Sequence, residues 1–383
     1  MRVLIHAVAM RKHGGGSRHL EGLVRALGQM DRDNQYLLYL DSRFGFVSPY
    51  ANILVHPVEI RSALHRLYWD QVLLPRVAHQ RRADVVVALF LFGMFRGSIP
   101  QVVLQRNSQF YCEAYLRQLS GPATLSIVLR RQMAYWTMRA SRIIITPTAA
   151  MRDMIRRYHS DLPADRFRVL RHGFERGQLH RQGLPEPVAQ QVKRSQARPV
   201  ILYVSHLEPH KGHDVAIEAV RELKRQGQPA LLWLTMDRRD WPEGYQRLMR
   251  RVHQWGLQRE VVNLGRLPEG SLDELYRRAD VFFFPSLCES FGFPIVEAMG
   301  YGLPIVAADT AVNRELCGAA AYYYPPFDAG AAARQLGSLL CSPAQDQQMR
   351  RLSEQQFSQS HLSWPEYASR FVGLLQEAVA GAR

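Results

Sequence analysis

The sequence predicts an α/β protein made of two domains, each built around a parallel β-sheet. A chain of 383 residues is longer than one hydrophobic core usually supports, so two domains of about 150–200 residues are expected. In the first half, short apolar runs alternate with stretches of helical spacing, an order typical of parallel sheets. The same alternation starts again near residue 200, after a polar segment rich in glycine and proline. We therefore expect domains over 1–176 and 199–363, joined by a linker over 177–198.

The expected strands are short and apolar. In the first domain they are 3–9, 36–40, 53–58, 85–89, 102–104, 143–146 and 167–170. After the first strand, three glycines at 14–16 precede a segment whose leucines and valines recur at the spacing of one helix face. The second domain is expected to contain helices 214–226, 271–279 and 294–300, and strands 200–205, 230–235, 261–264, 281–284 and 305–307.

The net charge of +15 is concentrated in the first half of the chain. Residues 1–190 contain 27 Lys and Arg against 13 Asp and Glu, a net charge of +14, whereas residues 191–383 contain 22 against 21, a net charge of +1. This asymmetry favours an anionic partner for the first half: nucleic acid, an anionic bilayer or a phosphorylated acceptor. No helix-turn-helix, zinc or RNP-like pattern is present, which argues against nucleic acid.

Other features of the sequence point to the cytoplasm. No apolar run reaches the ~18 residues of a membrane span, and the first residues lack the hydrophobic stretch of a signal peptide. The four cysteines are widely spaced, which favours free thiols over a disulfide framework or a zinc site.

The segment 284–307 contains the most informative motif. A strand is expected to end at Pro285, a loop follows, and Pro294 stands where a helix would begin, with Glu297 in its first turn. A loop of this kind, between a parallel strand and a helix N-terminus, binds phosphate readily. Carboxylates accept hydrogen bonds from sugar hydroxyls, so Glu289 and Glu297 could hold a transferred sugar and a ribose. Alternatively, Glu297 only complements the helix dipole and Glu289 is a solvated loop residue.

The same motif resembles a known enzyme family. Glu289 and Glu297, with Ser290-Phe291-Gly292-Phe293-Pro294 between them and Ala298-Met299 after them, resemble the E-x7-E signature of family 4 glycosyltransferases, retaining enzymes of the GT-B type. The resemblance implies two Rossmann-like domains facing a central cleft. The first would bind the acceptor and the second the nucleotide sugar, and segment 364–383 would cross back to the first domain.

Three further segments resemble this family at its donor site. In 203–212, Lys211 matches a lysine that meets the diphosphate, and His206 stands in the place of an arginine. Arg266 lies in a segment similar to the turn that binds the base, and Gly15 and Gly16 lie in one similar to the amino-terminal glycine loop near the phosphates. Where family members often have His-Asp or His-Asn beside the donor sugar, this chain has Arg106-Asn107. Sugar or acceptor contacts are accordingly expected from Arg106, Asn107 and His172.

The resemblance implies a retaining hexosyltransferase that needs neither a metal nor a cofactor. It would move a sugar from a nucleotide diphosphate to a glycan or lipid-linked acceptor in bacterial-type cell-surface polysaccharide or lipopolysaccharide synthesis. Glu289 would orient the sugar, while Lys211 and the backbone near Phe291 and Gly292 would stabilise the departing diphosphate. The D-x-D segment at 31–33, a pattern of metal-dependent GT-A enzymes, directly follows a helix and is more typical of a solvated turn.

The helix expected at 125–138 mixes arginines with leucine, tyrosine and tryptophan. Such a helix can lie on an anionic bilayer, which would place the protein peripherally on the inner face of the cell membrane. It can equally pack into its own domain with the arginine head groups in water. Three other functions stay open: a basic nucleic-acid-binding protein, another GT-B enzyme such as an epimerase or phosphorylase, and a non-catalytic GT-B-like scaffold.

Overall fold

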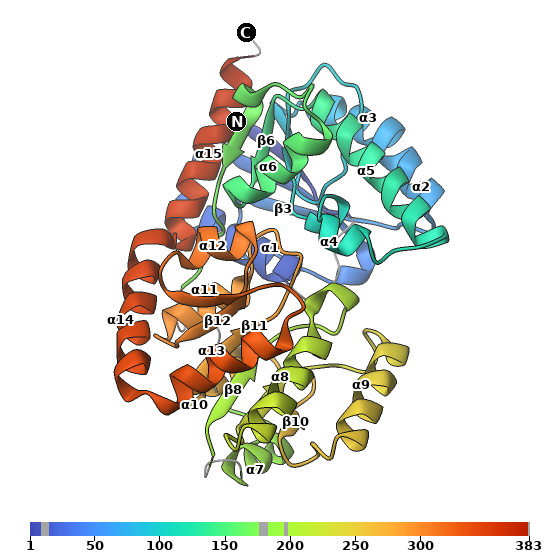
Figure 1. Ribbon diagram of the computed structural model, residues 1–383. Helices are drawn as coiled ribbons and strands as arrows, with labels where there is room; N and C mark the ends of the chain where they lie inside the picture. The colour runs from blue at the N-terminus through green and yellow to red at the C-terminus, as the bar shows by residue number, and fades with distance from the viewer. Residues whose placement is uncertain (9–14, 176–182, 195–197, 382–383) are drawn as a thin grey trace. The chain divides into compact units, whose positions relative to one another are not determined.

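The computed structural model describes residues 1–8, 15–175, 183–194 and 198–381, and the chain divides into two compact units (Figure 1). Unit 1 comprises Met1–Gly173 and Leu362–Arg383, and unit 2 comprises Phe174–His361. Each unit contains one parallel β-sheet with helices packed on it, so the predicted α/β class is confirmed.

Unit 1 is built on a seven-stranded sheet in the order β3-β2-β1-β4-β5-β6-β7, in which all neighbours are parallel. The strands are β1 (Arg2–His6), β2 (Gln35–Asp41), β3 (Ile53–Val58), β4 (Val85–Ala88), β5 (Gln101–Leu104), β6 (Ile143–Thr146) and β7 (Phe167–Val169). The strand order reverses beside β1, and ligands of open α/β sheets bind outside the carboxyl ends of the strands at such a point.

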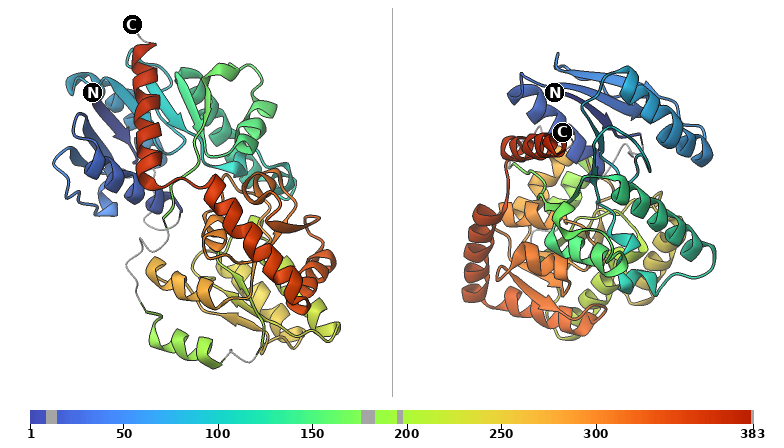
Figure 2. Two further views of the ribbon diagram at one scale, coloured as in Figure 1. Left: turned by 90° about the vertical axis from the view of Figure 1, so that its left-hand side faces the viewer. Right: turned by 90° about the horizontal axis from the view of Figure 1, so that it is seen from above.

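Helices α1 (Gly15–Met30) and α15 (Trp364–Ala380) cover one face of this sheet, and Figure 2 shows α15 running beside the strands. Gly22 allows the two helices to approach closely, because a Cβ there would lie 2.2 Å from the Trp364 ring. The other face packs against the π-helical turn η2 (Trp69–Leu73), α3 (Leu74–Gln80), α5 (Pro122–Ala140) and α6 (Ala149–Tyr158). Helix α2 (Ala63–Tyr68), which runs into η2, buries none of its residues. The short helix α4 (Glu113–Leu116) precedes α5.

Unit 2 has a six-stranded parallel sheet in the order β10-β9-β8-β11-β12-β13. Its strands are β8 (Val200–Tyr203), β9 (Leu231–Leu234), β10 (Val261–Asn263), β11 (Val281–Phe284), β12 (Ile305–Ala308) and β13 (Ala321–Tyr324). Its helices are α7 (Glu186–Arg194), α8 (His213–Arg225), α9 (Pro242–Gln254), α10 (Glu269–Arg278), α11 (Phe293–Gly300), α12 (Ala311–Cys317), α13 (Ala329–Cys341) and α14 (Pro343–Ser360).

All twelve expected strands occur at the predicted places, with ends that differ by at most three residues. The first strand ends at His6 rather than at residue 9, and strand β13 was not expected. The four cysteines are free thiols. No helix within the described ranges has both the length and the apolar character to cross a membrane.

Candidate functional site

The junction between β11 and α11 leads directly into a helix N-terminus. Gly292 precedes α11 with φ 89° and ψ 62°, a left-handed conformation that glycine adopts without strain. Gly292, the residue at the N-cap, has no side chain that could cap this helix end, and Pro294 occupies its first turn. The first turn contains no acid, so the prediction that Glu297 lies there is wrong: α11 begins at Phe293, and Glu297 falls in the second turn. The positive end of the helix dipole is therefore not neutralised by its own carboxylate.

The loop after β8 is held against this junction by a close backbone contact. Gly212 has φ 70°, and a Cβ at this residue would lie 2.4 Å from the Pro285 carbonyl oxygen. The Leu287 N–H donates a hydrogen bond of 3.0 Å to the carbonyl of His210. The Tyr203 hydroxyl, at the end of β8, donates to the Lys211 carbonyl at 2.5 Å. These contacts fix the backbone of Lys211 beside the loop that contains Glu289.

Lys211 and Glu289 form an ion pair at this junction. The Lys211 Nζ lies 2.7 Å from Glu289 Oε1, and the side chains are 18% and 13% exposed. Burial lowers the pKa of the Lys211 ammonium, but the Glu289 carboxylate outweighs burial and the net pKa is raised. The lysine is therefore a compact, permanent positive charge at neutral pH, next to a helix N-terminus. Such a pair can bind a diphosphate with its cation and a sugar hydroxyl with its anion.

Glu297 has different surroundings from Glu289. It is 3% exposed, and its Oε2 accepts a hydrogen bond of 2.7 Å from the hydroxyl of Tyr276 on α10. The Tyr276 ring stacks on Tyr301 with 5.4 Å between the ring centroids. The two glutamates of the motif therefore have different partners. Glu289 pairs with the Lys211 ammonium, and Glu297 accepts a hydrogen bond from the Tyr276 hydroxyl. Sequence reasoning missed Tyr276, which the spacing of α10 alone does not distinguish from a core residue.

His206 and Arg266, which lie far apart in sequence, share one carboxylate in unit 2. His206 Nδ1 lies 3.5 Å from Asp240 Oδ2, and the Arg266 guanidinium donates to the same carboxylate and lies 3.5 Å from Asp237. Burial lowers the pKa of the His206 imidazole, Asp240 opposes this, and the charges of Arg266 and Lys211 lower it further. Asp240 was not predicted as a site residue, although it follows β9, whose carboxyl end adjoins that of β8.

The predicted residues of unit 1 other than Asn107 lie near the first turns of α1. Gly15 and Gly16 form its first turn, and the Arg106 Nη2 donates a hydrogen bond of 2.9 Å to the Gly15 carbonyl. The Nη1 of Arg106 is buried without a hydrogen-bond partner among the described residues. The His172 ring lies 4.5 Å from that of His19, whose Nε2 is 2.7 Å from the Tyr367 hydroxyl. Residues 13 and 14 of the predicted glycine loop lie outside the described residues.

Charge and burial in this cluster favour an anionic ligand. Burial lowers the pKa of Arg106 to about 10, and burial together with Arg106 lowers the pKa of His19 and of His172 well below the usual range. The two imidazoles are therefore neutral, and Arg106 is the charged member of the group. His19 and Tyr367 were missed by sequence reasoning, since each lies on a helix among core residues. Asn107 instead caps a short 3-10 turn, accepting a hydrogen bond of 2.9 Å from the Gln109 N–H.

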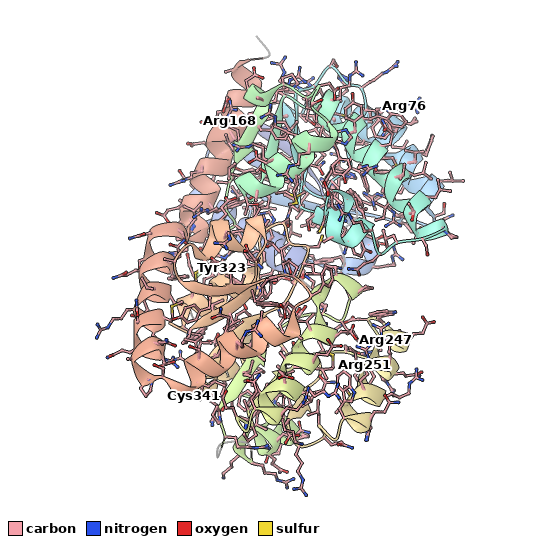
Figure 3. The ribbon with its side chains drawn as sticks, in the orientation of Figure 1. Arg76, Arg168, Arg247, Arg251, Tyr323 and Cys341 are labelled. Atoms are coloured by element: carbon pink, nitrogen blue, oxygen red, sulfur yellow. The ribbon has the colours of Figure 1, made fainter. Side chains whose placement is uncertain are left out.

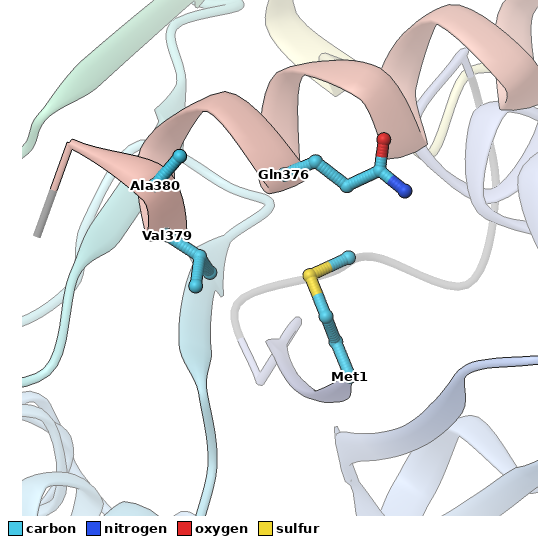
Figure 4. A pocket seen from close by; sticks show the side chains of 4 residues that line it. All are labelled: Met1, Gln376, Val379 and Ala380. Carbon is cyan, nitrogen blue, oxygen red and sulfur yellow. The ribbon is translucent and has the colours of Figure 1, made fainter. Parts of the chain in front are cut away.

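Two other features of unit 1 lie apart from these groups. The Asp31 carboxylate accepts hydrogen bonds from the backbone and side chain of Asn34 and from the Tyr36 hydroxyl, and thereby closes the turn after α1. A hollow of about 300 Å³ is lined by Met1, Gln376, Val379 and Ala380 (Figure 4). Its lining contains one amide and three apolar side chains, so it supplies no group for the chemistry of a transfer reaction.

Comparisons with known proteins assign this arrangement to a family. The model of "Glycosyltransferase Family 4" matches residues 13–177, and the model of "Glycosyl transferases group 1" matches residues 186–356. The chain belongs to the GT4-type glycosyltransferases. The resemblance carried by the E-x7-E segment is therefore confirmed.

Curated relatives of this GT4-type glycosyltransferase include two proteins with named activities. The chain is 29% identical over 143 residues to the serotype-specific mannosyltransferase WbdA of Escherichia coli, covering 37% of this chain and 17% of that protein. It is 28% identical over 173 residues to the D-inositol 3-phosphate glycosyltransferase of Nocardia farcinica, covering 44% of this chain and 38% of that protein. The alignments thus span less than half of either relative.

Solved structures show that the GT4-type glycosyltransferase has the GT-B fold. Sucrose-phosphate synthase from Thermosynechococcus elongatus matches with a TM-score of 0.75 at 17% identity, covering 99% of both chains. HepE from Anabaena, in complex with UDP and glucose, matches with a TM-score of 0.72 at 18% identity, covering 98% of this chain and 99% of that one. The predicted GT-B architecture is confirmed.

Proposed function

We propose that this GT4-type glycosyltransferase moves a hexose-type sugar, with retention of configuration, from a nucleotide diphosphate sugar to a glycan or lipid-linked acceptor. The observation that supports the donor class is the Lys211–Glu289 pair beside the N-terminus of α11. A diphosphate needs fixed positive charge, and a sugar needs a hydrogen-bond acceptor for its hydroxyls. Both kinds of group lie at this one junction. The structural neighbour HepE is described in complex with UDP-glucose, which agrees with a nucleotide-sugar donor.

The chemistry follows from the charges at the junction. Cleavage of the bond between the sugar and the diphosphate places negative charge on the leaving phosphate. Lys211 and the backbone N–H groups at the start of α11 would stabilise that charge, and a preorganised cation in a partly buried site is more effective than one in water. Glu289, released from Lys211 when the diphosphate takes over the ammonium, would accept a sugar hydroxyl and orient the ring. The reaction would therefore need no metal ion or other cofactor.

Three other groups are proposed to complete substrate binding. Glu297, buried and held by Tyr276, would accept from the ribose hydroxyls. His206 and Arg266, joined through Asp240, would lie near the diphosphate and the base. In unit 1, the unpartnered Nη1 of Arg106 would bind an anionic group of a substrate. Each of these proposed roles adds a contact with substrate to side chains whose contacts within the protein are described above.

The acceptor class rests on relatives whose names refer to the O-antigen and to lipopolysaccharide. An "O-antigen chain mannosyltransferase B" of Escherichia coli is 28% identical over 135 residues, and WaaG, described as a glycosyltransferase involved in lipopolysaccharide biosynthesis, matches with a TM-score of 0.71. We therefore place the reaction in cell-surface polysaccharide or lipopolysaccharide synthesis, on the cytoplasmic side of the cell membrane.

The test is a transfer assay after the donor has been found. A thermal-shift panel of nucleoside diphosphates and nucleotide sugars identifies the donor as the compound that stabilises the protein most. With that donor and an extract of lipid-linked glycans, release of nucleoside diphosphate must depend on the extract. We expect Glu289→Gln to lower kcat by about 10²–10³, the range found on removing one stabilising group from an active site. The matched control is Glu274→Gln, which alters an exposed pair on α10. Equal activity of the E289Q variant and the wild type would show that the junction is not the transfer site.

A further inference from the structure

Helices α2 and α5 of unit 1 expose an unusual number of large apolar side chains. Of the twelve large hydrophobic residues that are exposed within the described parts of the chain, six belong to these two helices. They are Leu64, Tyr68, Leu125, Val128, Leu129 and Trp136. Leu64 is 79% exposed and Leu125 is 61% exposed, so these side chains project into solvent rather than border the core. Apolar surface gathered in this way marks an interaction site more often than scattered single residues do.

The exposed residues of α5 form a stripe distinct from its core-facing side. Leu125, Leu129 and Trp136 recur at intervals of four and seven residues, which places them on one side of the helix. Ala134 and Met138 point into the sheet on the opposite side, where they belong to the apolar core. The core therefore accounts for one face of α5, whereas Leu125 and Leu129 of the stripe are more than half exposed.

The two helices lie on either side of one loop and form a single surface, which we call the α2–α5 face. The Gly93 carbonyl accepts a hydrogen bond of 2.9 Å from Gln71, directly after α2, and the Gly93 N–H donates one of 3.2 Å to Thr137 on α5. Phe95, in the same loop, packs its ring 5.3 Å from that of Trp136.

The surroundings of the α2–α5 face are basic. Between residues 85 and 152 the chain contains one acid, Glu113, and eight arginines. Arg130 and Arg139 on α5 are exposed, and so is Arg76 on α3 (Figure 3). The arginines of α9 in unit 2 differ, because Arg247 and Arg251 pair with Asp214 on α8 at 3.1 and 2.8 Å, and Arg251 also pairs with Glu218 at 3.2 Å. Exposed Arg130 and Arg139 thus lie on the same helix as the exposed apolar stripe.

We infer that the α2–α5 face docks on an anionic lipid bilayer. Protruding leucines surrounded by arginines match the boundary between acyl chains and anionic headgroups, where aliphatic groups insert and cations remain at the surface. Single-stranded nucleic acid instead requires aromatic platforms for its bases, and here four of the six apolar residues are not tryptophan or tyrosine. The inference rests on the proposed function for its biological setting, because a lipid-linked acceptor is reached at a membrane surface.

The experiment is flotation of the full chain with vesicles of phosphatidylcholine alone and of phosphatidylcholine mixed with phosphatidylglycerol, without donor or acceptor. We expect binding to the anionic vesicles that weakens as salt rises, since exposed charges are screened. The double variant Leu125→Asp/Leu129→Asp should abolish flotation. The double variant Arg130→Glu/Arg139→Glu should weaken binding by at least tenfold, because each surface cation contributes about fivefold to the partition.

Two control variants separate this surface from general effects. Val47→Asp places the same charge on another highly exposed residue of unit 1, and Arg32→Glu/Arg351→Glu makes the same change of net charge at exposed positions elsewhere. Both controls should float like the wild type. Circular dichroism and the Tm of each variant confirm that it is folded, which is expected because all the altered positions are exposed.

Several results would overturn the inference. The first is that the wild type fails to float with anionic vesicles, the second that L125D/L129D floats at the wild-type level, and the third that the control variants lose as much flotation as the test variants. Each of these three outcomes contradicts docking by this face. A dimer in analytical ultracentrifugation that L125D/L129D converts to monomer would assign the face to a second copy of the chain, and loss of oligonucleotide binding in the same variant would assign it to nucleic acid. The proposed function is tested separately, because E289Q should float normally and L125D/L129D should still transfer to a detergent-solubilised acceptor.

Discussion

The pairing of Lys211 with Glu289 leads to a prediction whose size follows from the structure. Their charged atoms lie 2.7 Å apart, and the two side chains are 18% and 13% exposed. At an effective dielectric constant of about 20, unit charges at this distance attract by roughly 6 kcal/mol. Desolvation of both groups cancels most of that attraction. We therefore expect a coupling energy of about 1–3 kcal/mol for folding in a double-mutant cycle of Lys211→Met and Glu289→Gln.

Binding of the donor should remove most of this coupling. In the proposed mechanism the diphosphate takes over the Lys211 ammonium, so the lysine no longer depends on Glu289. With the nucleoside diphosphate bound, the coupling should fall below about 0.5 kcal/mol, the level of an exposed pair. The free energy of unfolding of the four proteins is measured in urea without nucleotide. Calorimetric titration of each protein with the nucleoside diphosphate then gives the coupling in the bound state by linkage.

The pair Arg278–Glu274 is the matched control for this cycle. Its shortest charged-atom distance is also 2.7 Å, but its side chains are 38% and 34% exposed. The variants Arg278→Met and Glu274→Gln should couple by at most about 0.5 kcal/mol with or without nucleotide. The reasoning would be refuted by a Lys211–Glu289 coupling as small as that of the control, or by one that saturating nucleotide leaves unchanged.

Three further predictions concern the surroundings of this pair. Gly212→Ala should lower the free energy of unfolding by about 2 kcal/mol or more and weaken nucleotide binding, because a Cβ would meet the Pro285 carbonyl at 2.4 Å and φ is positive. Urea unfolding measures the stability and calorimetry measures the nucleotide affinity. A variant with unchanged stability and affinity would contradict the close approach of the two loops. Tyr276→Phe removes a hydrogen bond to the buried Glu297 and should cost about 1.5–3 kcal/mol in urea unfolding, whereas a cost under about 0.5 kcal/mol would mean that the carboxylate has other sufficient donors. Burial lowers the pKa of His206, so this residue is neutral at pH 7 and becomes a cation only as the pH falls. The donor KM of the wild type should therefore decrease toward acidic pH. In His206→Arg the KM should no longer show the pH dependence that protonation of His206 causes. Identical pH profiles of the two proteins would show that His206 does not meet the phosphates.

The predictions made from sequence were most accurate where local patterns suffice. Short apolar runs located most strands, because a strand buried on both faces needs little else. Strand β13 was missed because Ala321–Tyr324 has no β-branched residue and lies at the edge of its sheet, where Tyr322 and Tyr323 are only partly buried. Glu297 was placed in the first turn of α11 because Pro294 was taken as the first helical residue, and Phe293 in fact begins the helix.

By itself, the sequence determined the α/β class, the strand–loop–helix junction at 281–300 and the family, because these depend on residues that are close together in the chain. Only the tertiary structure decided which residues meet at that junction. Lys211 reaches Glu289 across 78 positions because β8 and β11 are neighbours in the sheet and Gly212 lets their loops touch. The same holds for the α2–α5 face: the spacing of Leu125 and Leu129 shows that they share a side of a helix, but only the packing of α5 on its sheet shows that this side is left in solvent.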